Sequence, residues 1–361
     1  MIQSLQRFFQ QPRHWLWMYL VLIATAEALI TFSSSLLGLG IHALLIIGLT
    51  LHGGLGRNVG QRQLALALVL VPLMRVLSLT LPITKLPMLA WYPAIGLPIL
   101  VSMLLLVRQL QLGRNALGLG WSMPIIQLML MGGGLGIGAA EYIMLQPSQF
   151  VVVFVWNTFA LATLLVMLSI GVIEELIFRG LLQALALPAF GRWALVYVSL
   201  LFAVMQIGYH SGTVLVWAFA MSLLFAYAVR WSGSTVGVAV AHGLANVTVF
   251  LIMPFLQQQT SPQIVLITRS VIAIGTVLAV LAVLILIVQQ MRQRRAAPAS
   301  AASQSSQLNV RMLRRSAGLN YIDLASRTGI PARQLAEIEY GYRLLTPEYR
   351  QRISLALNVK F

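Results

Sequence analysis

Three ionisable residues of the kind used in acid–base chemistry, Glu174, Glu175 and Arg179, lie within one apolar stretch of the sequence. An ionised side chain inside a membrane helix costs about 2.5–3.5 kcal/mol on insertion scales, so such groups persist mainly where they have a function. Glu175 and Arg179 are one helical turn apart and can pair, whereas Glu174 points about 100° away and keeps its carboxylate free. Two carboxylates in different environments can supply a general base. The alternative is an ion-paired anchor at a helix end, and the charges alone do not decide between the two.

Two later apolar stretches also carry polar side chains at helical spacing. His242 and Asn246 are one turn apart and share a helix face. Gln206 follows Phe202 by one turn, and His210 follows Gln206 by another. A lone histidine in a membrane helix is more often a hydrogen-bonding residue between helices than a catalyst. Three polar faces on three successive apolar stretches favour a shared polar site.

The elements that carry these residues are predicted to be membrane-spanning helices. Of the 361 residues, 59% are hydrophobic and 9% are charged, whereas about 25% of the residues in a soluble globular chain are charged. A spanning helix needs about 20 mostly apolar residues. The fold class expected is therefore all-α, a polytopic membrane helix bundle of about ten spans. The predicted spans are 15–33, 35–52, 64–81, 88–107, 123–145, 150–173, 193–209, 213–230, 234–254 and 265–290.

Basic residues between these segments predict the orientation of the chain, because cytoplasmic loops carry an excess of Lys and Arg. With a cytoplasmic N-terminus, every loop on that side carries arginine, and the opposite loops carry only Lys85 as a clear charge. An even number of spans returns the C-terminus to the same side. We therefore expect a multi-pass protein of the bacterial inner (plasma) membrane with both termini in the cytoplasm. The inner-loop arginines are Arg57, Arg62, Arg108, Arg114, Arg192, Arg230, Arg292, Arg294 and Arg295.

The composition changes after the last apolar segment. Residues 292–307 are first basic and then small and polar, which is typical of a flexible linker. Residues 308–361 have the pattern of a small soluble helical domain. The chain is thus predicted to contain N-terminal transmembrane helices at 1–113, a membrane core at 114–291, the linker, and a cytoplasmic domain. The absence of cysteine excludes disulfides, thiol catalysis, cysteine-bound zinc and lipidation at cysteine.

The order of the three polar motifs resembles the CPBP family, the CAAX-protease and bacteriocin-processing intramembrane proteases. The family signature is Glu-Glu-x-x-x-Arg, Phe-x-x-x-His and His-x-x-x-Asn on consecutive hydrophobic helices. This chain has the first motif at 174–179 and the third at 242–246, and the resemblance covers about residues 114–290. The second motif differs, because Gln206 occupies the histidine position and glutamine neither titrates nor binds metal well. His210, about 6 Å further along the same face, is a candidate substitute.

The resemblance implies hydrolysis of a peptide bond in a membrane-embedded or membrane-adjacent substrate. Glu174 would activate the water, and Glu175 with Arg179 would fix its orientation. His242 and Asn246 would polarise the scissile carbonyl or bind the oxyanion. A membrane sensor or scaffold without strong catalysis stays open as the alternative, because Gln206 departs from the family pattern.

The residues favour a glutamate-based reaction without metal, although the resemblance makes zinc a candidate cofactor. His242 is the one well-placed nitrogen ligand, and no His-Glu-x-x-His sequence occurs. An aspartyl intramembrane protease is excluded because the only aspartate, Asp323, lies in the tail. A rhomboid-type Gly-x-Ser-Gly is also missing.

The tail, residues 308–361, resembles the helix-turn-helix of Cro/repressor (XRE-like) proteins. This implies that the helix after Pro331 is the recognition helix, and the twelve basic against four acidic residues from 292 onward have the right sign for DNA. Tyr321, however, stands where such repressors often carry a glutamine that contacts phosphate, and some membrane-tethered domains of this type bind a cytoskeletal protein. DNA and a cytoplasmic protein both stay open as partners. By resemblance, Arg333 and Gln334 would face bases, and Arg327 and Arg343 would face phosphates.

Overall fold

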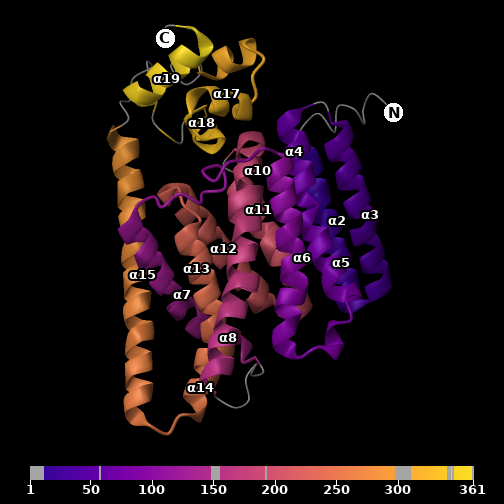
Figure 1. The fold of residues 1–361 in the computed structure, drawn as a ribbon, viewed down its shortest axis with the longest axis vertical. Helices are drawn as coiled ribbons and strands as arrows, with labels where there is room; N and C mark the ends of the chain where they lie inside the picture. Colours follow the sequence, from indigo (N-terminus) through magenta and orange to yellow (C-terminus); the bar gives the residue numbers. More distant parts are fainter. Residues whose placement is uncertain are drawn as a thin grey trace.

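The computed structural model describes residues 12–56, 58–147, 155–191, 193–296, 310–339, 343 and 345–359. Every regular element in these ranges is helical, which confirms the all-α class (Figure 1). The inner-loop residues Arg57 and Arg192 lie outside the described residues, as does the predicted linker from residue 297 onward.

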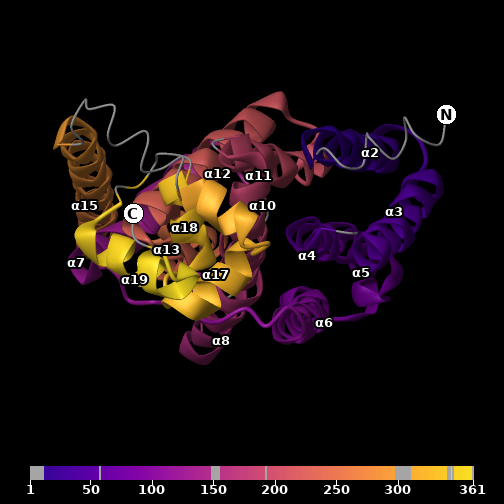
Figure 2. The same ribbon diagram turned by 90° about the horizontal axis from the view of Figure 1, so that it is seen from above.

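The N-terminal helices form a group on one side of the molecule (Figures 1 and 2). The span from Val59 to Thr80 is divided at Val69 into two helices, because Pro72 has no N–H to donate to the carbonyl of Leu68. The group consists of α2 (Pro12–Phe32), α3 (Ser35–Leu55), α4 (Val59–Leu68), α5 (Leu70–Thr80), the short η1 (Ile83–Lys85) and α6 (Met88–Gln109).

The membrane core contains the predicted polar motifs. Its second element is one continuous helix of 35 residues from Trp156 to Phe190, made of five consecutive pieces. The core comprises α7 (Pro124–Leu145), α8 (Trp156–Val166), η2 (Met167–Val172), α9 (Ile173–Glu175), η3 (Leu176–Leu182), α10 (Gln183–Phe190), α11 (Trp193–Val204), η4 (Ile207–Tyr209), α12 (Gly212–Ser232), α13 (Val236–Val247), η5 (Thr248–Ile252), α14 (Met253–Gln258) and α15 (Pro262–Ala296).

In the described part of the chain, nine helices are long and apolar enough to cross a membrane. The predicted span at 193–209 is the exception, because α11 has 12 residues. At 1.5 Å per residue α11 is about 18 Å long, against about 30 Å for the hydrocarbon core. The chain turns at Met205 and Gln206 and returns along α12. Figure 1 shows the start of α2 and the end of α15 at the same end of the bundle.

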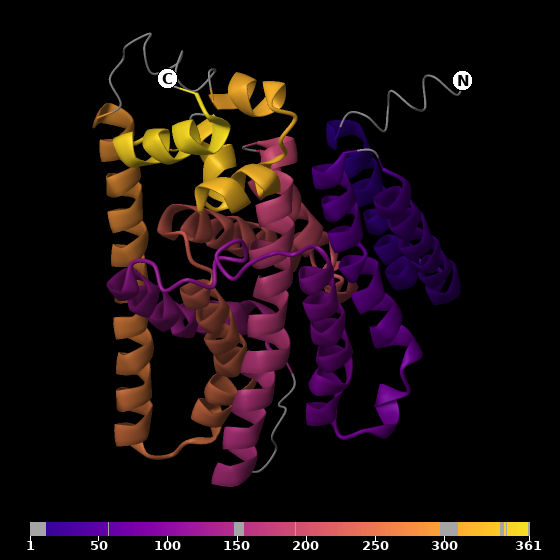
Figure 3. The same cartoon turned by 45° about the horizontal axis from the view of Figure 1, so that its top comes forward.

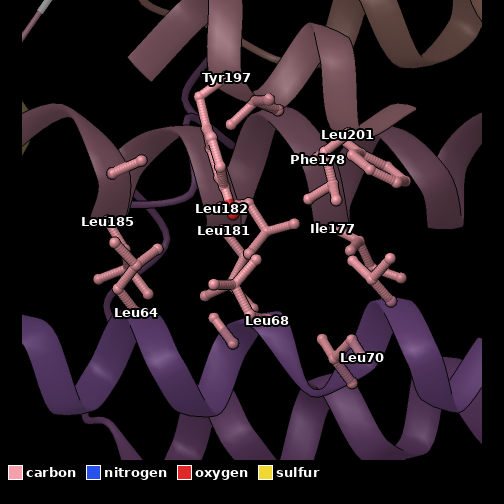
Figure 4. Close-up of a cluster of buried hydrophobic side chains, with 14 of the residues drawn as sticks. Leu64, Leu68, Leu70, Ile177, Phe178, Leu181, Leu182, Leu185, Tyr197 and Leu201 are labelled. Carbon is pink, nitrogen blue, oxygen red and sulfur yellow. The ribbon is translucent and has the colours of Figure 1, made fainter. Parts of the chain in front are cut away.

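Tight packing joins the N-terminal group to the helix that carries the glutamates. Figure 4 shows Leu64 and Leu68 of α4 against Leu181, Leu182 and Leu185 of η3 and α10. All five side chains are buried. The N-terminal helices therefore share one apolar core with the glutamate helix.

The tail forms a separate small core of its own. Its elements are a helix at 310–316, α17 (Tyr321–Thr328), α18 (Ala332–Glu339) and α19 (Pro347–Leu357). Asn320 caps α17 with a capping box, in which its side chain and that of Asp323 accept from backbone N–H groups. Figure 3 shows the tail lying across the end of the bundle where α10 and α15 terminate. The buried apolar residues are Val310, Leu324, Ile330, Leu335 and Ile353.

Candidate active site

The helix that carries Glu174 and Glu175 is widened on both sides of them. Residues 167–172 and 176–182 form π-helical turns, and the glutamates lie in the short α-helical piece between. Single π turns in an α-helix occur frequently at functional sites. The π-helical turns also change which residues share a face of this helix. A regular α-helical period of 3.6 residues does not predict that change.

Two glycines bring this helix against α13 at backbone distance. A Cβ on Gly171 would overlap the backbone N and Cα of Gly243, and a Cβ on Gly243 would lie 3.1 Å from the Cα of Met167. Small residues allow membrane helices to approach in this way. Because Gly171 is one turn before Glu174 and Gly243 directly follows His242, this contact sets the separation of the carboxylate and the imidazole.

We expect Gly171→Ala to destabilise the protein by about 1–3 kcal/mol, because the new methyl group meets backbone atoms rather than flexible side chains. Thermal unfolding in detergent, followed by tryptophan fluorescence, measures the effect. Gly48→Ala in α3 is the matched control, since a Cβ there meets nothing within 4 Å. An unchanged unfolding temperature for Gly171→Ala would contradict the packing described.

Glu175 is the centre of a buried hydrogen-bond network. Its Oε1 atom accepts from the Arg179 guanidinium at 2.8 Å and lies 2.8 Å from Nδ1 of His242. Glu175 is fully buried and Arg179 is 1% exposed. A carboxylate on Nδ1 fixes the orientation of an imidazole ring, so the opposite nitrogen, Nε2, has a defined direction. The predicted pairing of Glu175 with Arg179 is therefore present.

Arg179 is further held by its surroundings. Its guanidinium donates to the carbonyl of Ser222 in α12 at 3.3 Å and lies 5.0 Å from the ring centroid of Phe202. Cation–π contacts of this kind stabilise a desolvated guanidinium. One turn further along the glutamate helix, Gln183 donates to the carbonyl of Ala226 at 3.0 Å.

Glu174 faces the other side of the same imidazole. Its Oε2 atom is 4.0 Å from Nε2 of His242, too far for a direct hydrogen bond and close enough for one water to bridge the two. The Glu174 side chain is 23% exposed and that of His242 is 14% exposed. Asn246 donates through Nδ2 to the carbonyl oxygen of His242 at 3.1 Å, which places it one turn beyond the imidazole.

Gln206 and His210 have different positions relative to these groups. Gln206 lies in the turn between α11 and η4 and lines the same cavity as Glu174 and His242. His210 has a left-handed backbone, with φ of 54°, and its ring packs edge-on against Phe32 of α2. It is not among the residues that line the cavity. The structure therefore does not bring the candidate substitute His210 to the site.

The cavity has a volume of about 520 Å³ and is lined by six of the predicted site residues: Glu174, Glu175, Arg179, Gln206, His242 and Asn246. Further polar side chains that the sequence did not predict for the site also line the cavity, among them Arg75, Tyr92, Glu141 and Trp217. Arg75 and Glu141 could have been found, because an ionisable residue inside a predicted span indicates a functional site.

The donor set does not fit zinc. Structural and catalytic zinc sites use at least three nitrogen, sulfur or carboxylate ligands. In the described ranges no three His, Cys, Asp or Glu side chains are arranged to bind a metal ion. Glu175 is already occupied by Arg179 and His242, and an amide stands at position 206.

The tail is docked on the membrane core through its predicted recognition helix, α18. Arg333 is 7% exposed and donates to the carbonyl of Val229 in α12 at 2.8 Å, while its Nε atom donates to Glu337 at 3.2 Å. Burial lowers the pKa of Arg333, and Glu337 opposes that shift. The resemblance predicted that Arg333 faces bases, but in the structure Arg333 faces α12, because Glu337 and the carbonyl of Val229 satisfy its guanidinium.

The other residues assigned to DNA have separate environments. Gln334 accepts a hydrogen bond from the Tyr349 hydroxyl at 2.9 Å, and Arg343 donates to Glu337 at 3.0 Å. Arg327 is exposed. Tyr321 donates to Glu339 at 2.7 Å, which explains its presence where similar domains often carry a glutamine. Arg327 alone of these residues presents its side chain freely to solvent.

Comparison with protein families gives two matches in this chain. Residues 156–248 match the family described as type II CAAX prenyl endopeptidase Rce1-like, and residues 310–361 match a helix-turn-helix family. The first range contains all three polar motifs. No curated protein and no solved structure matches the chain. The chain therefore contains a segment similar to the Rce1-like CAAX protease family within a multi-pass membrane bundle, followed by a segment similar to a helix-turn-helix family.

Proposed function

We propose that this protein is an intramembrane endopeptidase of the CAAX-protease type, with a helix-turn-helix tail that regulates it. The observation that carries the proposal is the pairing of Glu174 with His242 across 4.0 Å in a cavity between membrane helices. The match to the Rce1-like family supports it. We further propose that both termini face the cytoplasm at the inner membrane, because of the arginine-rich loops on that side.

In the proposed reaction, water lies between Glu174 and His242. The Glu174 carboxylate accepts a proton from this water, and the resulting hydroxide attacks the scissile carbonyl carbon. In the protonated imidazole of His242, Nδ1–H donates to Glu175, and Nε2–H donates to the oxyanion that forms, together with the second amide hydrogen of Asn246. The carbon–nitrogen bond then breaks, and the proton on Glu174 passes to the departing amine. Glu175 and Arg179 keep the imidazole in place throughout, and no step requires a metal ion.

Cleavage of a library of membrane-spanning peptides by purified protein in lipid nanodiscs tests this function. Mass spectrometry of the products identifies the cleaved bonds. We expect cleavage in the presence of a metal chelator, since the proposed groups are all side chains. A complete absence of products across the library would contradict the proposal.

Gln206→His is expected to change kcat/KM by less than about tenfold, because an amide and an imidazole can each supply one hydrogen bond to the water or oxyanion. Gln206→Leu removes that hydrogen bond and should lower kcat/KM, also by less than about tenfold. Both variants are compared with the unaltered protein on the same peptide. Activity that appears only after Gln206→His would identify a decayed enzyme instead.

The docked tail favours a second function, a membrane-tethered DNA-binding regulator. The recognition helix α18 packs against α10, and Arg333 is bound to α12. DNA and the membrane core would then compete for one face of the tail. This function is independent of catalysis and would persist in a chain with a weakened active site.

A further inference from the structure

A buried group of charged and polar side chains lies in the N-terminal helices, outside the family-matched residues. Glu27 of α2 is 1% exposed and His42 of α3 is fully buried. Nε of Arg75 in α5 donates to Oε1 of Glu27 at 2.7 Å, and Nη2 of Arg75 forms an ion pair with Oε2 at 2.7 Å. Nε2 of His42 lies 3.1 Å from Oε1 of Glu27. A two-pronged arginine–carboxylate contact fixes the guanidinium geometrically as well as electrostatically.

Arg75 also reaches out of this group to the active-site region. Its terminal nitrogen donates to the carbonyl of Met205 at 2.9 Å, and the side chain lines the cavity with Glu174 and His242. The last carbonyls of a helix have no partner inside the helix, and a cation is favourable there. Met205 directly follows the last residue of α11, so Arg75 caps the helix that stops short within the bundle.

The turn after α11 needs such a contact. Non-helical backbone at membrane depth is tolerated only where protein buries it or where it lines a cavity. The turn from Met205 to His210 contains the short η4 and ends in a left-handed residue. Gln206, Gly208 and Tyr209 of this turn all line the cavity.

We propose that Arg75 and Glu27 are positioning residues that hold the turn carrying Gln206 against the active site. The N-terminal helices then supply a part of the site that residues 156–248 lack. Glu27 holds the guanidinium, and the guanidinium holds the carbonyl of Met205. His42 contacts the same carboxylate oxygen of Glu27 as Nε of Arg75 does.

The experiment uses a reporter thiol in this turn, which is possible because the chain has no cysteine of its own. Gly208→Cys is suitable, since a Cβ there meets nothing within 4 Å. We compare the rate at which a small membrane-permeant methanethiosulfonate modifies this thiol with Arg75 intact and with Arg75→Gln. We expect about a 10- to 150-fold faster modification with Arg75→Gln, the effect of losing one buried hydrogen bond from a charged group.

Two further variants separate positioning from general damage. Arg62→Gln is the matched control, because Arg62 also donates to a helix carbonyl, that of Gly53, away from the cavity, and should leave the thiol rate unchanged. Arg75→Lys keeps the charge and should give an intermediate rate. Equal thiol rates for Arg75, Arg75→Lys and Arg75→Gln in folded protein would overturn the proposal, as would an equal increase with Arg62→Gln.

The thiol measurement is independent of catalysis. If peptide cleavage is never detected, the proposed function fails, whereas the position of the turn is still decided by the modification rates. Where cleavage is detected, Arg75→Gln should lower kcat more than it raises KM, with partial recovery in Arg75→Lys. The reason is that a displaced Gln206 affects the transition state more than substrate binding.

Discussion

Replacing Glu174 with glutamine is expected to lower the rate of peptide cleavage by about 100- to 10,000-fold, the usual contribution of a general base. Glutamine preserves the size of the side chain but cannot accept the proton from water. The imidazole of His242, 4.0 Å away, should keep its place because Glu175 holds its other nitrogen. Single-turnover cleavage in nanodiscs measures the chemical step directly.

Two comparisons make this result specific. Glu348→Gln removes an exposed carboxylate of the tail and should leave the rate unchanged. Glu175→Gln should also reduce the rate, and the double variant with Glu174→Gln should lose little more, because the two glutamates act on the same imidazole. Equal rates for the unaltered protein and Glu174→Gln would exclude Glu174 as the base.

Releasing the tail is expected to increase the affinity of the full-length protein for DNA by about 10- to 100-fold. If the docked form makes up about 90–99% of the molecules, only about 1–10% can bind DNA, and docking weakens the apparent affinity by about 10- to 100-fold. Ala184→Arg should release the tail, because Ala184 lines the cavity between α10 and the tail, where Arg311, Arg314 and Arg315 already lie. Fluorescence anisotropy with labelled duplex DNA, at several salt concentrations, measures the affinity.

The controls for this prediction use the same positions. Ala184→Ser adds no charge and should leave DNA affinity unchanged. Adding Arg333→Gln to Ala184→Arg should weaken binding again by about tenfold or more if Arg333 contacts a base after release. Binding that is absent, or independent of salt, in both Ala184→Arg and the unaltered protein would show that DNA is not the partner.

The helices and the pairing within the first motif could be predicted from the sequence, because both depend on local periodicity. The predicted spans at 35–52 and 213–230 correspond to α3 and α12. The pairing of Glu175 with Arg179 needs only the four-residue spacing. The short α11 could not be predicted, since the apolar composition of 193–209 gives no indication that the helix stops at Val204.

The candidate site was predictable only in its motif residues. Arg75 lies about 130 residues from its partner Met205, and no local pattern joins the two. The docking of Arg333 on Val229 is likewise a contact between separate domains. The π-helical turns on both sides of Glu174 change which side chains share a face of that helix, and residue spacing in the sequence does not reveal them.

Helix α12 contacts both the glutamate helix and the tail through its backbone carbonyls. Its carbonyls at Ser222, Ala226 and Val229 accept hydrogen bonds from Arg179 of the Glu175 network, from Gln183 one turn further on, and from Arg333 of the tail. Thermodynamic linkage then imposes a reciprocal relation on anything that moves this helix. The factor by which a filled cavity shifts tail release must equal the factor by which tail release shifts substrate affinity.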